Sequence, residues 1–149
     1  MTCIAGAPGR LVADSRETGV IKRSCVKFFR RHDYLVGGAG ASAPLAFLEH
    51  QIRWPKKLSV HALTRWVWKT HDPDYLDLEE TELIIVTREA VYVTEGRIVH
   101  PPAKFGAVGS GAAWALGYLE AAPGDLDGAV KAACKYDPWC AGPLRSAEL

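Results

Sequence analysis

Short apolar runs separated by turn residues fill the first forty positions, and this pattern predicts β-strands rather than helices. A turn signal, Ala-Pro-Gly at residues 7–9, separates the first two runs, so we expect a hairpin at the start of the chain. A second pair of strands leads into a glycine-rich corner. The predicted strands are residues 2–5, 11–13, 25–30 and 34–36, and the corner is residues 37–40.

Apolar residues in the middle of the chain recur every three or four positions, which is the spacing of one helix face. This spacing predicts a helix at residues 43–52 that Pro55 terminates. A second helix is predicted at residues 58–69, with Ser59 as a candidate N-cap. Residues 71–82 carry many polar and acidic side chains and are expected to form a solvated connection.

Apolar runs of strand length return in the second half, at residues 83–87, 91–93, 98–99 and 105–108. Ser110 is then expected to open a helix that runs to about Glu120. Asp125 is expected to cap a last helix that ends at Tyr136. Pro138 and the Gly-Pro pair at 142–143 are expected to end this helix, and the final residues are expected to be loose, as chain ends usually are.

The order of these elements is strands, two helices, strands and two helices. It predicts an α+β fold in which strand pairs pack face to face with helices outside. The length of 149 residues favours one domain over residues 1–149. The formal net charge of +1 gives no electrostatic footprint for nucleic acid or an anionic membrane. Neither a transmembrane run nor a signal peptide is recognisable, so we expect a cytoplasmic protein.

The chain has four cysteines: Cys3, Cys25, Cys134 and Cys140. In a reducing cytoplasm they are expected to be free thiols, mostly buried. Cys134 and Cys140 lack a nearby histidine that would complete a zinc pattern, so no metal site is predicted. The five histidines show no spacing with a serine or cysteine that suggests a conventional triad.

Thr2 is the first candidate for chemistry, because methionine is usually removed when a small residue follows it. Its free α-amine would have a pKa near ~8 and could accept the proton of its own hydroxyl. A positive charge nearby would favour the deprotonated forms, and Lys27 in the third predicted strand is the candidate. Asp14 is the nearest carboxylate in the strand pattern. The alternative is that Lys27 is an edge-strand lysine reaching to water.

Five short segments together resemble the proteasome β-type family, and most of all the bacterial HslV peptidases and short proteasome-like proteins of phages. The resemblance covers residues 1–50 and 81–142, and the segments are residues 2–5, 12–19, 26–27, 37–40 and 109–111. It implies a four-layer αββα sandwich of the N-terminal-nucleophile hydrolases. It also implies a threonine endopeptidase that needs no cofactor, acts on peptides or unfolded proteins and forms a homo-oligomeric ring. An ATP-dependent unfoldase is left open as a further partner.

The resemblance also assigns roles to particular residues. Thr2 matches the nucleophile and Lys27 the lysine beside it, with Asp14 as the aspartate that orients the lysine. The remaining matches are Gly37 for the oxyanion-binding N–H, Thr18 and Gly38 for substrate binding, Ser110 for a proton relay near the nucleophile, and Asp137 for a supporting carboxylate.

Several alternatives stay open at this point. Ser110 could serve only as a helix cap, and Cys3 is a rival nucleophile that would be exposed only if Thr2 were also lost. The tryptophans are expected to pack helices or an oligomer contact. The whole chain could be an inactive structural or scaffolding subunit, for instance in a phage, or an amidase acting on small amides.

Overall fold

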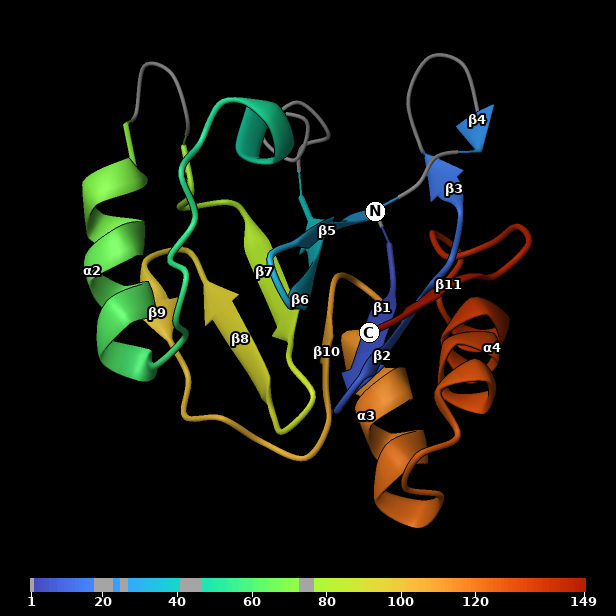
Figure 1. The fold of residues 1–149 in the computed structure, drawn as a ribbon. Helices are drawn as coiled ribbons and strands as arrows, with labels where there is room; N and C mark the ends of the chain where they lie inside the picture. The colour runs from blue at the N-terminus through green and yellow to red at the C-terminus, as the bar shows by residue number, and fades with distance from the viewer. Residues whose placement is uncertain (1, 18–22, 25–26, 41–46, 73–76) are drawn as a thin grey trace.

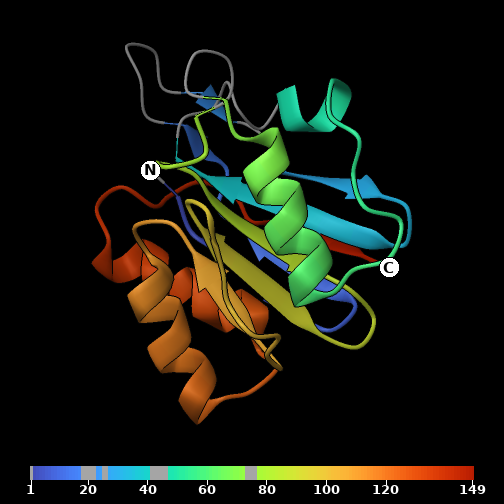
Figure 2. The ribbon, with the colours of Figure 1, turned by 90° about the vertical axis from the view of Figure 1, so that its left-hand side faces the viewer.

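The computed structural model describes residues 2–17, 23–24, 27–40, 47–72 and 77–149. Two antiparallel sheets lie face to face at the centre of the molecule, and helices cover their outer faces (Figure 1). A view at right angles shows α2 against one sheet and α3 and α4 against the other (Figure 2). The four-layer αββα architecture of an α+β fold is therefore confirmed.

The first sheet has the strand order β10-β1-β2-β11. Its centre is a hairpin, in which Ile4 pairs with Ala13 and Ala7 pairs with Arg10. Gly9 closes the turn with a φ of 80°, a conformation that glycine adopts without strain. The strands are β1 (Ile4–Ala7), β2 (Arg10–Ala13), β10 (Gly106–Val108) and β11 (Arg145–Glu148).

The second sheet has the order β5-β6-β7-β8-β9, and every neighbouring pair is antiparallel. Its strands are β5 (Phe28–Arg31), β6 (Tyr34–Ala39), β7 (Glu82–Val86), β8 (Val91–Glu95) and β9 (Ile98–Val99). The strands β3 (Arg16–Glu17) and β4 (Arg23–Ser24) pair with each other and form a separate two-stranded antiparallel sheet.

The two sheets are held together by a core that contains Ile4, Leu11, Leu35, Ile84 and Val108. Glycines allow the sheets to come close. A Cβ atom on the glycine at position 6 would lie 2.6 Å from a methyl carbon of Val86 on the opposite sheet. The close contact leaves little space between the middles of the sheets, so an open site has to form at their ends.

Local sequence signals position the helices. In α2 (Val60–Thr70) the Ser59 hydroxyl accepts a hydrogen bond from the backbone N–H of Ala62 at 3.1 Å, and in α4 (Leu126–Tyr136) Asp125 accepts one from Gly128 at 2.9 Å. Both predicted caps are confirmed. The helix α2 packs on the second sheet, while α3 (Ala112–Ala121) and α4 pack on the first.

Two expectations about the second half of the chain were wrong. The last residues are not loose, because they form β11, which pairs with β2, and because Ala147 and Leu149 pack against the core between the sheets. The helix α3 begins at Ala112, and its N-cap is Gly111 rather than Ser110. The helix predicted at 43–52 falls partly outside the described residues, and positions 47–50 are helical.

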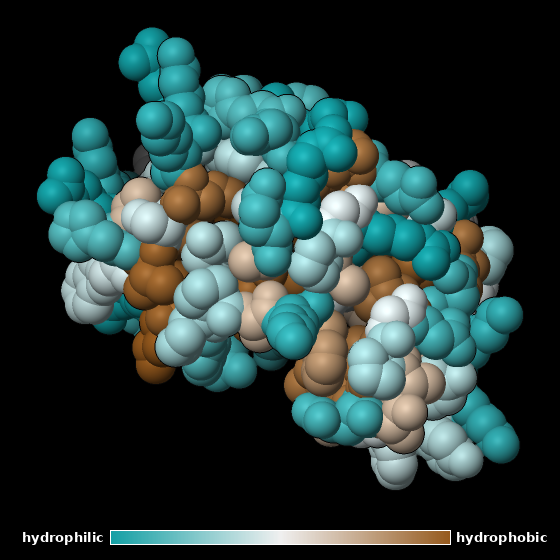
Figure 3. Space-filling view, turned by 60° about the horizontal axis from the view of Figure 1, so that its bottom comes forward, coloured by the Kyte–Doolittle hydropathy of each residue, from teal (hydrophilic) through white to brown (hydrophobic). Residues whose placement is uncertain are grey.

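None of the helices in the described ranges is long and apolar enough to cross a membrane. On the face of the molecule in Figure 3, hydrophobic residues lie in separate patches between hydrophilic side chains.

Candidate active site

The backbone of Thr2 is held by the loop that follows β10. The carbonyl oxygen of Thr2 accepts hydrogen bonds from the N–H of Gly111 at 3.3 Å and from the hydroxyl of Ser110 at 3.4 Å. Gly109 packs on the same carbonyl group, and a Cβ atom on Gly109 would lie 2.2 Å from its oxygen. Because Gly109 also has a φ of 93°, glycine is required at this position. The loop therefore fixes Thr2 at the entry to β1.

The carboxylate of Asp14 organises the buried side of the site. Asp14 follows β2, and its own N–H donates to the carbonyl of Cys3 at 3.0 Å, which extends the hairpin toward Thr2. Its side chain is fully buried. The donors to its two oxygens are Thr2 Oγ1 (2.6 Å), Cys3 N (2.8 Å), Lys27 Nζ (2.8 Å), Ala141 N (3.2 Å) and Arg16 N (3.3 Å).

Lys27 lies immediately before β5, with only 8% of its side chain exposed. Its Nζ and the hydroxyl of Thr2 donate to the same oxygen of Asp14, so the ammonium group is held beside the hydroxyl. This geometry excludes the alternative in which Lys27 reaches to water. The ion pair is buried, and removing either partner would leave an uncompensated charge.

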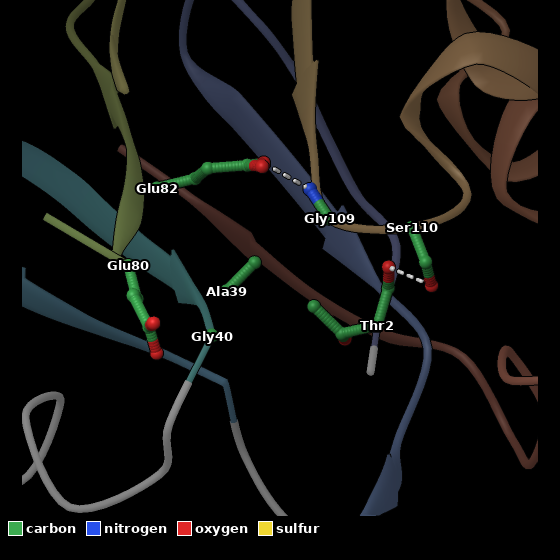
Figure 4. A pocket seen from close by; sticks show the side chains of 7 residues that line it. All are labelled: Thr2, Ala39, Gly40, Glu80, Glu82, Gly109 and Ser110. Carbon is green, nitrogen blue, oxygen red and sulfur yellow. Dashed lines mark hydrogen bonds between the residues drawn. The ribbon is translucent and has the colours of Figure 1, made fainter. Parts of the chain in front are cut away.

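A cavity of about 310 Å³ opens beside Thr2. Figure 4 shows Thr2 and Ser110 on one side of it and Ala39, Gly40 and Glu80 on the other. Glu82 reaches across toward Gly109, whose N–H donates to its Oε2 at 2.6 Å. The cavity lies where the ends of the two sheets separate, and among the described residues that line it only Thr2 and Ser110 carry a hydroxyl group.

Ser110 is not a helix cap, and its hydroxyl faces Thr2 and Cys140. Asp137 completes this group at the end of α4, where it accepts hydrogen bonds from Trp139 N at 2.9 Å and Cys140 Sγ at 3.2 Å. Burial alone would raise the pKa of the Asp137 carboxyl. Hydrogen bonds from Ser110, Trp139 and Cys140 outweigh burial and lower that pKa below its ordinary value. Burial and the bond to Asp137 raise the pKa of the Cys140 thiol to about 12.

The structure does not bring Gly37 and Gly38 to the cavity, where the sequence-based assignment expected them. Gly38 donates its N–H to Lys27 O at 3.1 Å. Because N–H groups alternate along an antiparallel strand, Gly37 turns its N–H toward β7, where it pairs with Ile84. Both N–H groups are thus used within the sheet. Ala39 and Gly40, at the end of the same strand, line the cavity instead.

Two further candidate residues named from the sequence are Thr18 and Cys3. Thr18 lies outside the described residues. Cys3 is completely buried, and burial followed by the nearby Cys140 raises the pKa of its thiol well above the ordinary range, so its side chain is packed rather than reactive. Sequence reasoning missed Glu80 and Glu82, because a charged stretch before a strand is usually solvated. No group of side chains suited to a metal ion occurs in the described part of the chain.

Comparisons with solved structures show which known proteins share this fold. Thiobacillus denitrificans BPH in complex with epoxomicin matches with a TM-score of 0.77 and 24% identity, over 99% of this chain and 97% of that one. A second structure of Thiobacillus denitrificans BPH matches with a TM-score of 0.75 and 24% identity, over 99% of this chain and 96% of that one. Eukaryotic HslV from Trypanosoma brucei matches with a TM-score of 0.69 and 19% identity, over 99% of both chains.

The chain has the HslV fold. Neither a scan against protein-family models nor a search of curated proteins found a match, so the likeness is one of structure. Within this HslV-like fold, the hairpin of β1 and β2 carries Thr2 and Asp14 to the cavity, and the entry to β5 supplies Lys27. The result is a buried carboxylate that binds both an ammonium group and the hydroxyl of Thr2, and Thr2 lines the cavity. This arrangement is suited to nucleophilic attack on a carbonyl group.

Proposed function

We propose that the chain is a threonine endopeptidase in which loss of Met1 makes Thr2 the N-terminal residue and the nucleophile. One observation carries this proposal: the hydroxyl of Thr2 and the ammonium of Lys27 share one oxygen of the buried Asp14, beside a cavity. An ammonium group held beside the hydroxyl in this way can stabilise the negative charge that forms when the hydroxyl attacks a carbonyl carbon. The HslV-like fold supports the same conclusion.

In the proposed reaction, Thr2 Oγ leaves Asp14 and attacks the carbonyl carbon of a peptide bond in the cavity. Its proton passes to the α-amine of Thr2, whose ordinary pKa of about 8 suits a base near neutral pH. The C–N bond then breaks, and the amine returns the proton to the leaving nitrogen. Water hydrolyses the resulting ester and restores the hydroxyl. Lys27 stabilises the developing negative charge on Oγ, and Asp14 holds Lys27 in place.

Gly40 lies just past the end of β6 and lines the cavity across from Thr2, and we assign to its backbone N–H the oxyanion-binding role that the resemblance gave to Gly37. The Ser110 hydroxyl contacts the Thr2 carbonyl and interacts with Asp137, and we assign to these two residues the proton relay to the α-amine of Thr2. A peptide substrate is proposed to lie along the end of β6 as an added strand, and Thr18 is kept as a proposed contact to it. Epoxomicin, which the Thiobacillus denitrificans protein binds, is proposed to bind in the same cavity here.

A homo-oligomeric ring is part of the proposal. Trp114 and Tyr136 stack with ring centroids 4.9 Å apart while 49% and 54% of their surfaces are exposed. Exposed aromatic pairs are typical of interfaces between proteins. Native mass spectrometry of the wild type and of Trp114→Glu tests this, and a monomeric wild type would exclude the ring. The free thiols in the described part of the chain fit a cytoplasmic location, and an unfoldase partner stays open.

The function is tested by hydrolysis of fluorogenic peptides with untagged protein. We expect wild-type activity, retention of part of it in Thr2→Ser, and loss of at least about a thousandfold in Thr2→Ala. Thr64→Ala on α2 is the matched control and should leave the rate unchanged. Epoxomicin should inhibit the wild type. Activity on small amides but on no peptide would favour an amidase.

The second candidate is an inactive structural subunit with the same fold, and one observation favours it. Thr2 is only 4% exposed, and its hydroxyl is engaged by Asp14 rather than free in the cavity. This candidate predicts that Met1 is retained and that no peptide is cleaved by the wild type. The two candidates therefore give opposite results in the same assay.

A further inference from the structure

A hydrogen bond links the two sheets at the cavity that Thr2 lines. Glu82 begins β7 in the second sheet, and its Oε2 accepts the N–H of Gly109 at 2.6 Å. Gly109 follows β10 of the first sheet, so this contact joins the sheets at the end where they separate (Figure 4). A bond to a carboxylate is stronger than one between neutral groups, and this one is short.

Strand pairing alone does not favour a carboxylate at this position. In the register of β7 and β8, Glu82 lies directly opposite Glu95, and like charges opposite each other are destabilising. On its other side Glu82 pairs with Ala39, which offers no cation. The Glu95 side chain, by contrast, is exposed to solvent, and its Oε2 lies 3.5 Å from Nε2 of His100. The bond to Gly109 is the one favourable polar contact that the described residues offer to the Glu82 side chain.

The loop that Glu82 holds is the loop that positions Thr2. Gly109 packs against the Thr2 carbonyl, and Gly111 and Ser110 reach that carbonyl only through hydrogen bonds of 3.3 and 3.4 Å. Bonds of this length are weak, so they do not fix the loop by themselves. The 2.6 Å bond from Gly109 to Glu82 is the shortest that the loop makes. Displacing Gly109 would shift the Thr2 backbone and the Ser110 hydroxyl together.

We propose that Glu82 is a positioning residue for the reaction at Thr2, acting through Gly109 rather than by touching the reacting atoms; this inference rests on the proposed peptidase function. By holding the N–H of Gly109 it keeps the 109–111 loop against Thr2 and keeps Ser110 in reach of the nucleophile. The role requires an acceptor oxygen at this position and not a negative charge.

Three variants separate these requirements. Glu82→Ala removes the acceptor, Glu82→Gln keeps an oxygen in its place without the charge, and Glu95→Ala is the matched control on the neighbouring strand. We expect Glu82→Ala to lower kcat about ten- to a hundredfold, the usual effect of a small misplacement of reacting groups, with KM changed less than about threefold. Glu82→Gln should recover kcat to within about threefold of the wild type, and Glu95→Ala should match the wild type.

Amide hydrogen exchange supplies a readout that does not depend on activity. In the segment 106–112 we expect Glu82→Ala to speed exchange at Gly109 at least about tenfold, while Glu82→Gln and Glu95→Ala leave it near the wild-type rate. If the wild type cleaves no peptide, the proposed function fails while exchange still tests the tie between the sheets. The inference is overturned if Glu82→Ala leaves kcat or exchange unchanged, if it acts on KM alone, or if Glu82→Gln fails to rescue.

Discussion

The buried ion pair of Asp14 and Lys27 gives the sharpest prediction for stability. Lys27→Met keeps the length and the apolar stem of the side chain and removes only the charged group. Asp14 then stays fully buried with the Thr2 hydroxyl and three backbone N–H groups as donors but without a cation.

Breaking a buried pair by removing one partner costs about 3–5 kcal/mol. The four donors that remain on Asp14 offset part of this loss, so we expect a decrease of about 3 kcal/mol in the free energy of unfolding for Lys27→Met. Asp14→Asn should lower the free energy of unfolding by at least as much, because it leaves the buried Lys27 without a carboxylate partner and turns an amide NH₂ toward groups that are themselves donors. The double variant leaves neither charge of this pair buried. Its loss of unfolding free energy should therefore be smaller than the sum of the two single losses by about 2 kcal/mol.

Urea unfolding of the four proteins measures this cycle. Asp127→Asn is the matched control, because Asp127 pairs with Arg10 at 2.6 Å on the surface, where an ion pair is worth about 0–1 kcal/mol. The reasoning is refuted if Lys27→Met costs no more than Asp127→Asn. It is also refuted if the costs of the two single variants simply add.

Other predictions concern the loop and the support behind Thr2. Gly109→Ala should destabilise the protein by about 3 kcal/mol or more, because its Cβ would lie 2.2 Å from the Thr2 carbonyl oxygen. Gly117→Ala in α3, with open space around the added Cβ, should stabilise the protein by about 0.5–1 kcal/mol. Thermal unfolding of the two variants and the wild type measures both effects. Because the pKa of Asp137 is lowered in the folded state, its ionised carboxylate should contribute fully to the free energy of unfolding above about pH 5, and this contribution should be lost as the pH falls through the lowered pKa. The free energies of unfolding of the wild type and Asp137→Asn should therefore become equal in acid. The Cys140 thiol, with its pKa raised to about 12, should resist iodoacetamide at pH 8 until urea unfolds the protein, and rapid labelling of the native protein would contradict this.

Local signals in the sequence were enough to predict most elements of the fold. Ser59 and Asp125 mark helix starts because capping depends on residues three positions apart. The strand β11 could not be found in this way, because residues 145–148 are mostly polar and form a strand only through pairing with β2. Such pairing depends on contacts distant in sequence, which periodicity does not report.

The site was predictable where residue type and strand position decide it. Thr2, Asp14 and Lys27 could be grouped because a hairpin and the next strand bring them to one end of the sheets. The position of Gly37 away from the cavity could not be foreseen, because counting along a motif does not tell which way an N–H points in a paired strand. Glu82 was missed because its partner Gly109 is 27 positions away and belongs to the other sheet.

The central claim is that Thr2 acts as an N-terminal nucleophile, and intact-protein mass spectrometry on untagged material tests it most directly. The account predicts a mass that lacks one methionine, which leaves the α-amine of Thr2 free beside Asp14 and Lys27. A mass that retains Met1 in purified, folded protein would contradict the account, because an amide nitrogen cannot accept the hydroxyl proton, and the inactive structural subunit would then be the better description.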